Sequence, residues 1–194
     1  MQNDDPIEEF SDEETDGPDH EQPSLVSEIR GWTRDVFFAI GTAVIIVVFF
    51  YQPVRVEGTS MLPELVDQER IFVNKFVYRI EDVARRDIVV FWYPLDTTKS
   101  YIKRVIGLPG DVVEVRRGRV LVNGEILDEI YVPPEFFDRR TYSPVYVEPD
   151  SYYVLGDHRS QSNDSRMWGL VPTENIYGKA VFRYWPMSKM GTID

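Results

Sequence analysis

The chain has no cysteine and only two histidines, His20 and His158, among its 194 residues. Without cysteine there is no disulfide framework, no thiolate nucleophile and no cysteine-ligated metal. Two histidines are too few for the usual His-built zinc centre, so we expect neither a metal nor a cofactor. A histidine-dependent catalytic triad would have His158 as its candidate base.

Positive charge is missing from the N-terminal part. Residues 1–29 hold eleven of the 33 acidic residues and no Lys or Arg, which leaves 22 acidic against 21 basic residues in the remainder. The net charge of −12 therefore belongs to this part, and the near-neutral remainder offers no basic footprint for nucleic acid. A segment so acidic and so poor in large apolar residues cannot bury enough surface to offset chain entropy. We predict a disordered acidic tail over residues 1–30 and no nucleic-acid partner.

Long apolar runs are also scarce, and the main one covers the sixteen uncharged residues 36–51. As a helix this run would be about 24 Å long, which is short of the roughly 30 Å hydrocarbon layer of a bilayer. Extension to Trp32 adds an interfacial aromatic residue, Tyr51 would mark the other interface, and Pro53 would end the helix.

We predict an uncleaved membrane anchor over residues 31–52. A buried core helix and a cleavable signal peptide are the alternatives, although no small-x-small cleavage site follows the run. Arg30 and Arg34 before the run, against Arg55 after it, predict a cytoplasmic N-terminus.

After residue 53 the sequence changes to short apolar runs separated by glycine and proline. Asn123-Gly124 is a strong hairpin signal, and a second turn is expected at Arg117-Gly118. Strands are predicted at residues 88–93, 101–106, 112–115, 120–122, 125–127, 152–155 and 179–184. The pattern is typical of a mainly β fold, an antiparallel barrel-like domain over residues 53–194 that follows one transmembrane helix. The Pro- and Tyr-rich residues 128–150 are interpreted as an irregular loop.

Ser60 is a candidate nucleophile in the turn-forming segment Gly58-Thr-Ser-Met-Leu-Pro63. Most serines in such turns are solvated and inert, and attack on an amide needs a partner that removes the hydroxyl proton. His158 could serve, but it precedes Arg159 in a polar loop, where an ordinary surface imidazole is the simpler interpretation.

Lys103 is the other candidate base. In a strand over residues 101–106, Tyr101 and Lys103 share one face and Arg104 lies on the other, so one base should be exposed and one buried. Burial would lower the lysine pKa, and a shift from about 10.4 to about 8 costs roughly 3 kcal/mol. The neutral amine could then accept the Ser60 proton. The alternative is an exposed, inert strand lysine.

A third cluster, residues 156–169, is rich in Asp, Arg and Ser. It is either an exposed polar loop or a shell of hydrogen-bonding groups that holds a catalytic residue in place. Asp157 or Asp164 should pair with Arg159 or Arg166, and spacing does not decide between these pairings.

These clusters, in this order behind an apolar segment, resemble the type I signal peptidases over residues 36–186. Four segments carry the resemblance: residues 60–65, 85–91, 101–111 and 156–169. It implies a membrane-bound serine endopeptidase that removes N-terminal signal peptides from exported preproteins after a small-x-small site, typically Ala-x-Ala. Ser60 would be the nucleophile and Lys103 the general base, without a cofactor.

The resemblance also implies supporting residues. Ser162 would hydrogen-bond the lysine, while Asp164 and Arg166 would brace the site. Substrate would bind as an added β-strand. The walls of the small-residue pockets would be Val56, Met61, Leu65, Tyr101 and Ile102.

The chain departs from the family pattern at several positions. Gly58 occupies a place where some members carry a serine that helps to bind the oxyanion, Arg86 replaces a frequent glycine, and His158 replaces the usual asparagine. The accessory domain of some members is reduced here to about residues 112–150.

The resemblance places the catalytic domain on the extracytoplasmic side of the plasma (inner) membrane, with a thylakoid membrane as the alternative. Tyr184 and Trp185 are predicted to seat the domain on the bilayer, where such rings prefer to lie, although simple core packing is the alternative. The sequence makes no prediction of the oligomeric state.

Two other functions compete with this interpretation. A soluble Ser/Lys peptidase with a related β fold, such as a self-cleaving repressor, would carry a DNA-binding module that this sequence lacks. A membrane-tethered β domain that only binds partners would leave Ser60 and Lys103 incidental.

Overall fold

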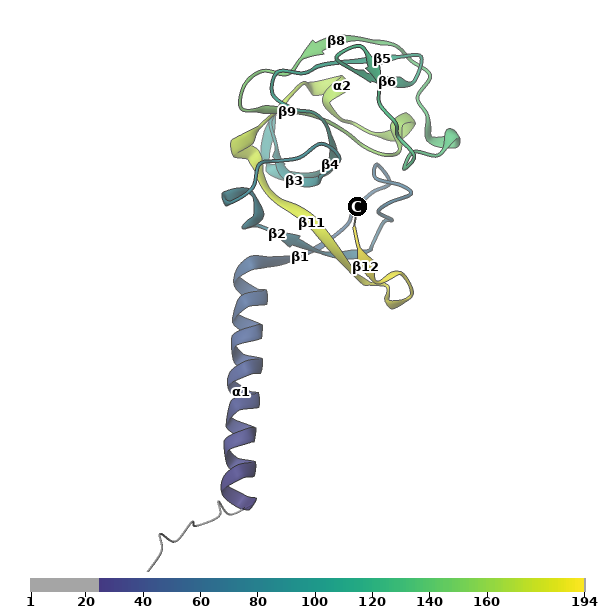
Figure 1. Cartoon of the computed structure of the whole chain (residues 1–194). Coiled ribbons are helices and arrows are strands. Elements are labelled where there is room, and N and C mark those ends of the chain that lie inside the picture. The colour runs from purple at the N-terminus through teal and green to yellow at the C-terminus, as the bar shows by residue number, and fades with distance from the viewer. Residues whose placement is uncertain (1–24, 194) are drawn as a thin grey trace, which may run out of the picture. The chain divides into compact units, whose positions relative to one another are not determined.

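The computed structural model describes residues 25–193 (Figure 1). The chain divides into two units, residues 1–42 and residues 43–194. The acidic tail predicted over residues 1–30 lies almost entirely outside the described residues.

Helix α1 (Leu25–Phe50) begins six residues before the predicted anchor and ends just before strand β1 (Tyr51–Arg55). The sequence suggested that Pro53 would end the helix. Pro53 instead lies inside strand β1, after the helix has ended at Phe50. Large apolar side chains along the helix, such as Phe37, Phe38 and Phe49, are exposed. Over the part of the chain that the structure describes, no helix combines the length and the hydropathy needed to cross a membrane.

The second unit is built on an eight-stranded antiparallel sheet (Figure 1). In spatial order its strands are β1, β2 (Arg70–Asn74), β11 (Ile176–Trp185), β3 (Ile88–Tyr93), β4 (Asp96–Gly107), β9 (Ser151–Leu155) and β10 (Val171–Pro172), with β12 (Gly191–Thr192) paired to β11. Strands β1 and β10 form the two ends and each pairs with a single neighbour. Within the described residues the sheet therefore stays open, and the barrel-like closure expected from the sequence is wrong.

A smaller four-stranded sheet has the order β7 (Glu125–Ile126), β6 (Arg119–Val122), β5 (Val112–Arg116) and β8 (Tyr142–Tyr146). Asn123 and Gly124 both have positive φ angles, 53° and 87°, as a tight two-residue hairpin turn requires. Strand β8 lies inside the segment interpreted as an irregular loop, so that interpretation is wrong over these residues. Its Pro144 hides the strand in the sequence, and proline is tolerated there because β8 is an edge strand.

Short helical segments join the strands. Their bounds are Val77–Arg79 (η1), Pro134–Phe136 (η2), Arg159–Gln161 (η3), Ser165–Trp168 (α2), Thr173–Asn175 (η4) and Met187–Lys189 (η5).

Apolar packing fixes the segment that follows β1. Met61 and Leu65 are buried in one core cluster with Val56, Ile71 and Val73. Because a close-packed core tolerates little displacement, these side chains hold the turn around Ser60 in one place on the sheet.

Candidate active site

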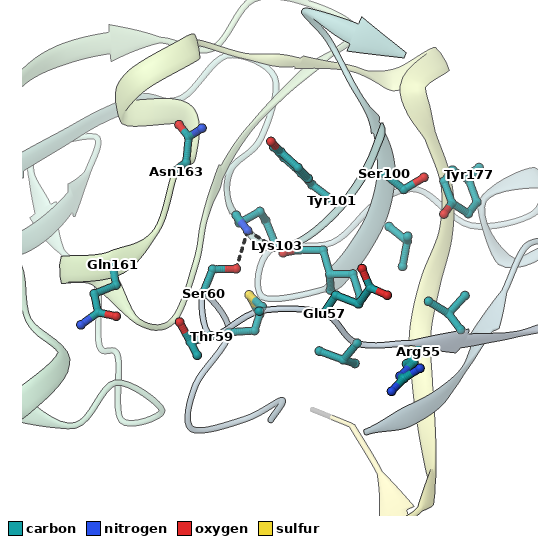
Figure 2. Close-up of a pocket in the computed structure, with 16 residues that line it drawn as sticks. Arg55, Glu57, Thr59, Ser60, Ser100, Tyr101, Lys103, Gln161, Asn163 and Tyr177 are labelled. Atoms are coloured by element: carbon teal, nitrogen blue, oxygen red, sulfur yellow. Dashed lines mark hydrogen bonds between the residues drawn. The ribbon is translucent and has the colours of Figure 1, made fainter. Parts of the chain in front are cut away.

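Ser60 and Lys103 meet although they are 43 positions apart in the chain (Figure 2). Ser60 lies in the turn after β1, and Lys103 lies in β4. The Lys103 Nζ donates to Ser60 Oγ at 2.7 Å and to the Ile102 carbonyl at 3.0 Å. A hydroxyl and an amine at this separation can exchange a proton directly.

The amine is shielded from water. Lys103 is 4% exposed, and burial lowers its pKa from 10.5 to about 8, against the smaller opposing effects of Asp164 and Asp157. Desolvation penalises the ammonium form. A substantial fraction of this lysine is therefore uncharged at mildly alkaline pH, as a general base must be.

The expectation that only one of the two neighbouring bases would be buried is wrong. Arg104 is 1% exposed; its Nε and Nη2 donate to the two oxygens of Asp157 at 3.0 and 2.9 Å, and its guanidinium lies 4.2 Å from the Tyr131 ring centroid. Strand β4 lies inside the large sheet and both of its faces are covered at this point. Alternation along the strand therefore directs the Lys103 and Arg104 side chains to opposite faces of the sheet, and neither is exposed to solvent.

Gly58 shapes the turn that carries the nucleophile. Its φ angle is +92°, in the left-handed region that favours glycine. Its N–H donates to Asp67 Oδ1 at 2.8 Å, and this bond lowers the pKa of the Asp67 carboxyl. The turn thus has a fixed polar anchor two residues before Ser60.

The polar cluster at residues 156–169 forms a buried frame. Asp164 accepts from the Gly156 N–H at 3.1 Å and from Arg166 Nε at 2.8 Å. Arg166 also donates to Asp138 at 2.9 Å and to the Arg159 carbonyl at 2.7 Å. Asp164 and Arg166 therefore hold the loop behind the site together.

The other charges of this cluster pair with residues far away in the chain. Asp157 pairs with Arg104, and Arg159 pairs with Glu129 at 2.6 Å. Of the pairings considered from the sequence, only Asp164 with Arg166 forms an ion pair here.

Ser162 does not make the hydrogen bond to Lys103 that the resemblance implied. Its buried Oγ has no hydrogen-bond partner in residues 25–193, and the Lys103 amine donates to Ser60 and Ile102 instead. Ser162 nevertheless lies close by. A Cβ added at Gly156 would collide with Ser162 Oγ and with the Ser60 carbonyl, so this glycine permits the close approach.

A cleft of about 450 Å³ opens over the dyad (Figure 2). Of the predicted wall residues, Val56, Met61, Tyr101 and Ile102 line it, whereas Leu65 lies fully buried in the core and does not. Polar residues to which the sequence gave no site role also line the cleft: Arg55, Glu57, Thr59, Ser100, Gln161, Asn163 and Tyr177. In Figure 2, Gln161 and Asn163 lie on one side of the dyad and Arg55 and Tyr177 lie on the other.

His158 is not the surface imidazole expected from the sequence. It is 7% exposed, its Nδ1 lies 3.2 Å from the Thr59 carbonyl oxygen, and its ring centroid lies 4.3 Å from that of Phe136. Its backbone N–H donates to the Ser60 carbonyl at 3.1 Å. Since it makes no hydrogen bond to Ser60 Oγ, the only base that the structure brings to this hydroxyl within residues 25–193 is Lys103.

The described residues do not form the arrangement of ligands that a metal site needs. Between residues 25 and 193, no group of three or more His, Asp or Glu side chains is arranged to hold a metal ion.

The family model described as signal peptidase, peptidase S26, matches residues 29–185. The chain belongs to this family. It is 38% identical to signal peptidase I of Leptolyngbya laminosa, over 91% of this chain and 89% of that protein. It is 42% identical to a probable signal peptidase I-2 of Synechocystis (81% and 72% covered) and 36% identical to signal peptidase I S of Bacillus subtilis (88% and 96% covered).

Besides the burial of Arg104, two features of this signal peptidase family member were not predicted from the sequence. The burial of His158 could not be predicted, because its partners Thr59 and Phe136 are remote in the chain. No sequence pattern marks the polar residues that line the cleft. The one weak indication is that Glu57 stands three positions before Ser60.

Proposed function

We propose that the chain is a serine endopeptidase that removes N-terminal signal peptides from exported preproteins after a small-x-small site, with Ser60 as nucleophile and Lys103 as general base. The observation that carries this proposal is the 2.7 Å contact between the Ser60 hydroxyl and a buried amine with a lowered pKa. Membership of the signal peptidase family supports the same reaction.

The reaction would begin when the uncharged Lys103 amine takes the Ser60 proton while Oγ attacks the scissile carbonyl carbon. The carbonyl oxygen becomes an oxyanion, and the backbone N–H of Ser60, which has no acceptor among the described residues, would stabilise it. The Lys103 ammonium then returns its proton to the leaving amine. Water, deprotonated by the same lysine, cleaves the acyl-enzyme and regenerates the Ser60 hydroxyl.

The substrate would bind as an extended strand in the cleft. Strand β9 pairs with β4 only from Arg104 onward, so residues 100–102 have one unpaired edge beside the cleft. Main-chain hydrogen bonds to such an edge tolerate varied sequences. Apolar walls formed by Val56, Met61, Tyr101 and Ile102 favour small side chains sterically.

Attachment to the bilayer is a further part of the proposal. The exposed apolar side chains of α1 and the exposed Trp185 support it, whereas Tyr184 stacks on Phe72 with a centroid distance of 4.5 Å. The N-terminus would be cytoplasmic and the catalytic unit extracytoplasmic, at a plasma (inner) or thylakoid membrane. Resistance to alkaline carbonate extraction tests attachment to the bilayer, and protease protection tests the topology. Quenching of Trp185 by lipid-borne quenchers tests its contact with the bilayer. Full release by carbonate would contradict the anchor.

The decisive experiment is cleavage of an Ala-x-Ala preprotein by the purified full chain in detergent, with N-terminal sequencing of the product. Ser60→Ala and Lys103→Ala should each lower kcat by about 1,000-fold or more. Lys99→Ala is the matched control, because Lys99 lies on the same strand but is exposed and paired with Asp96. Normal processing by both dyad variants would reject the enzyme assignment and favour a binding domain. Because the base is a lysine, a metal chelator should leave the rate unchanged.

A further inference from the structure

We propose that His158 is a positioning residue that aims the Ser60 backbone N–H at the oxyanion, by holding the other side of the same peptide unit. This inference rests on the proposed function and assigns the orientation of the oxyanion donor to a side chain outside the dyad.

The argument starts from the peptide between Thr59 and Ser60. Its carbonyl oxygen faces His158 Nδ1 at 3.2 Å. A carbonyl oxygen can only accept, so this ring nitrogen carries the proton and donates, and it does so in either charge state of the imidazole. In a planar trans peptide, the C=O and the N–H point in opposite directions. When His158 holds the Thr59 carbonyl, the Ser60 N–H must therefore point away from His158.

The N–H so directed is available for substrate. It donates to no acceptor within residues 25–193, and Ser60 itself lines the cleft. An unpaired backbone donor on a cleft-lining residue, and on the nucleophile itself, is what a developing oxyanion needs.

The rest of the turn is held by the bond from Gly58 N–H to Asp67 and by the burial of Met61 and Leu65. The peptide that carries the Ser60 N–H rotates about Thr59 and Ser60, and of these two residues Thr59 is exposed and Ser60 is only partly buried. The Leu62 N–H also donates to the Thr59 carbonyl, at 3.2 Å, but this contact comes from within the same turn. His158 supplies the restraint from outside the turn.

His158 restrains the next peptide as well. Its backbone N–H donates to the Ser60 carbonyl at 3.1 Å, so one residue binds two consecutive carbonyls around the nucleophile. The His158 carbonyl in turn accepts from the Gln161 N–H at 3.0 Å, so the backbone that carries the imidazole is itself held. The restraint is therefore rigid enough to define the direction of the donor.

Two substitutions isolate the Nδ1 bond. His158→Leu keeps a branched side chain of similar bulk and removes the donor. His158→Asn places an amide nitrogen on Cγ, the same attachment as Nδ1, and keeps the donor. We expect the leucine variant of the full chain to lose about 10- to 100-fold in kcat on an Ala-x-Ala preprotein, with KM changed less than about 2-fold. The asparagine variant should recover most of that loss.

A transition-state probe separates positioning from general damage. A peptide aldehyde forms a tetrahedral adduct with a serine, and its oxygen occupies the oxyanion position, whereas an uncleaved product peptide does not. The leucine variant should bind the aldehyde more weakly by the same factor that kcat falls, while its affinity for the product peptide stays at the wild-type value.

Phe136→Leu is the control for packing. It removes the ring contact but leaves the Nδ1 bond, so it should lower Tm with little change in kcat. Wild-type aldehyde affinity in His158→Leu, or no recovery in His158→Asn, would overturn the inference. These failures differ from failure of the proposed function, in which the wild-type chain itself would not cleave the preprotein.

Discussion

At the scale of single residues, Lys103 combines a catalytic benefit with a cost in stability. The same burial that lowers its pKa to about 8 also makes the charged form unfavourable in the folded chain. Two measurable consequences follow from this one group.

The first consequence is a pH profile. Only the uncharged amine can accept the Ser60 proton, so kcat/KM should fall as pH drops below about 8 and level off above it, with an apparent pKa of about 8. Initial rates on a peptide substrate between about pH 6 and about pH 10 test this. A flat profile across the interval would exclude Lys103 as the base.

The second consequence concerns unfolding. The pKa of Lys103 is about 8 in the folded chain, against 10.5 for an ordinary lysine. Between these two pH values the unfolded chain binds more protons, so stability rises with pH. Below the folded pKa the full penalty applies, on the order of 3 kcal/mol. Lys103→Met should therefore abolish cleavage and yet increase the free energy of unfolding at neutral pH by about 2 kcal/mol. Urea denaturation measures it, and a less stable methionine variant would contradict the account.

At the scale of elements, β4 and the loop after β9 are joined by the buried Arg104–Asp157 pair. Asp157→Ala removes the carboxylate that faces this guanidinium and should cost about 3–5 kcal/mol of stability. Replacing both partners by apolar residues, as in Arg104→Met with Asp157→Leu, should restore much of it. Chemical denaturation of Arg104→Met, Asp157→Leu and the double variant tests the coupling, and additive effects of the two single substitutions would contradict it.

Local patterns predicted the elements whose signal lies within a few residues. Strand β3 has the predicted bounds 88–93, and the Asn123-Gly124 turn forms as expected. Strand β4 extends back to Asp96 through a polar stretch with no apolar alternation, and β10 and β12 have two residues each, too short to show a pattern.

The site follows the same division. The approach of Ser60 to Lys103 was anticipated, with the family resemblance linking segments that are distant in the chain. The burial of Arg104 and His158 was not anticipated, because it depends on Asp157, Thr59 and Phe136, and spacing carries no information about which remote charges or rings will meet.

At the scale of the whole molecule, every residue proposed for catalysis belongs to the unit formed by residues 43–194. A chain that begins at residue 43 should therefore cleave a short soluble peptide with a kcat/KM close to that of the full chain. It should process a preprotein inserted in lipid vesicles more slowly, because the segment proposed to hold enzyme and substrate at one surface is incomplete. Parallel assays on the two substrates test this, and equal losses on both would contradict it.

The shielded amine of Lys103 also makes the protein selectively reactive. An uncharged amine attacks electrophiles, whereas an ammonium does not, and Lys103 lines an open cleft. By contrast, Lys99 on the same strand is exposed, and its ion pair with Asp96 raises its pKa. A peptide with a small C-terminal residue and a sulfonyl fluoride or activated ester should therefore acylate or sulfonylate this one amine in preference to the surface lysines, which provides a route to covalent inhibitors directed at a lysine.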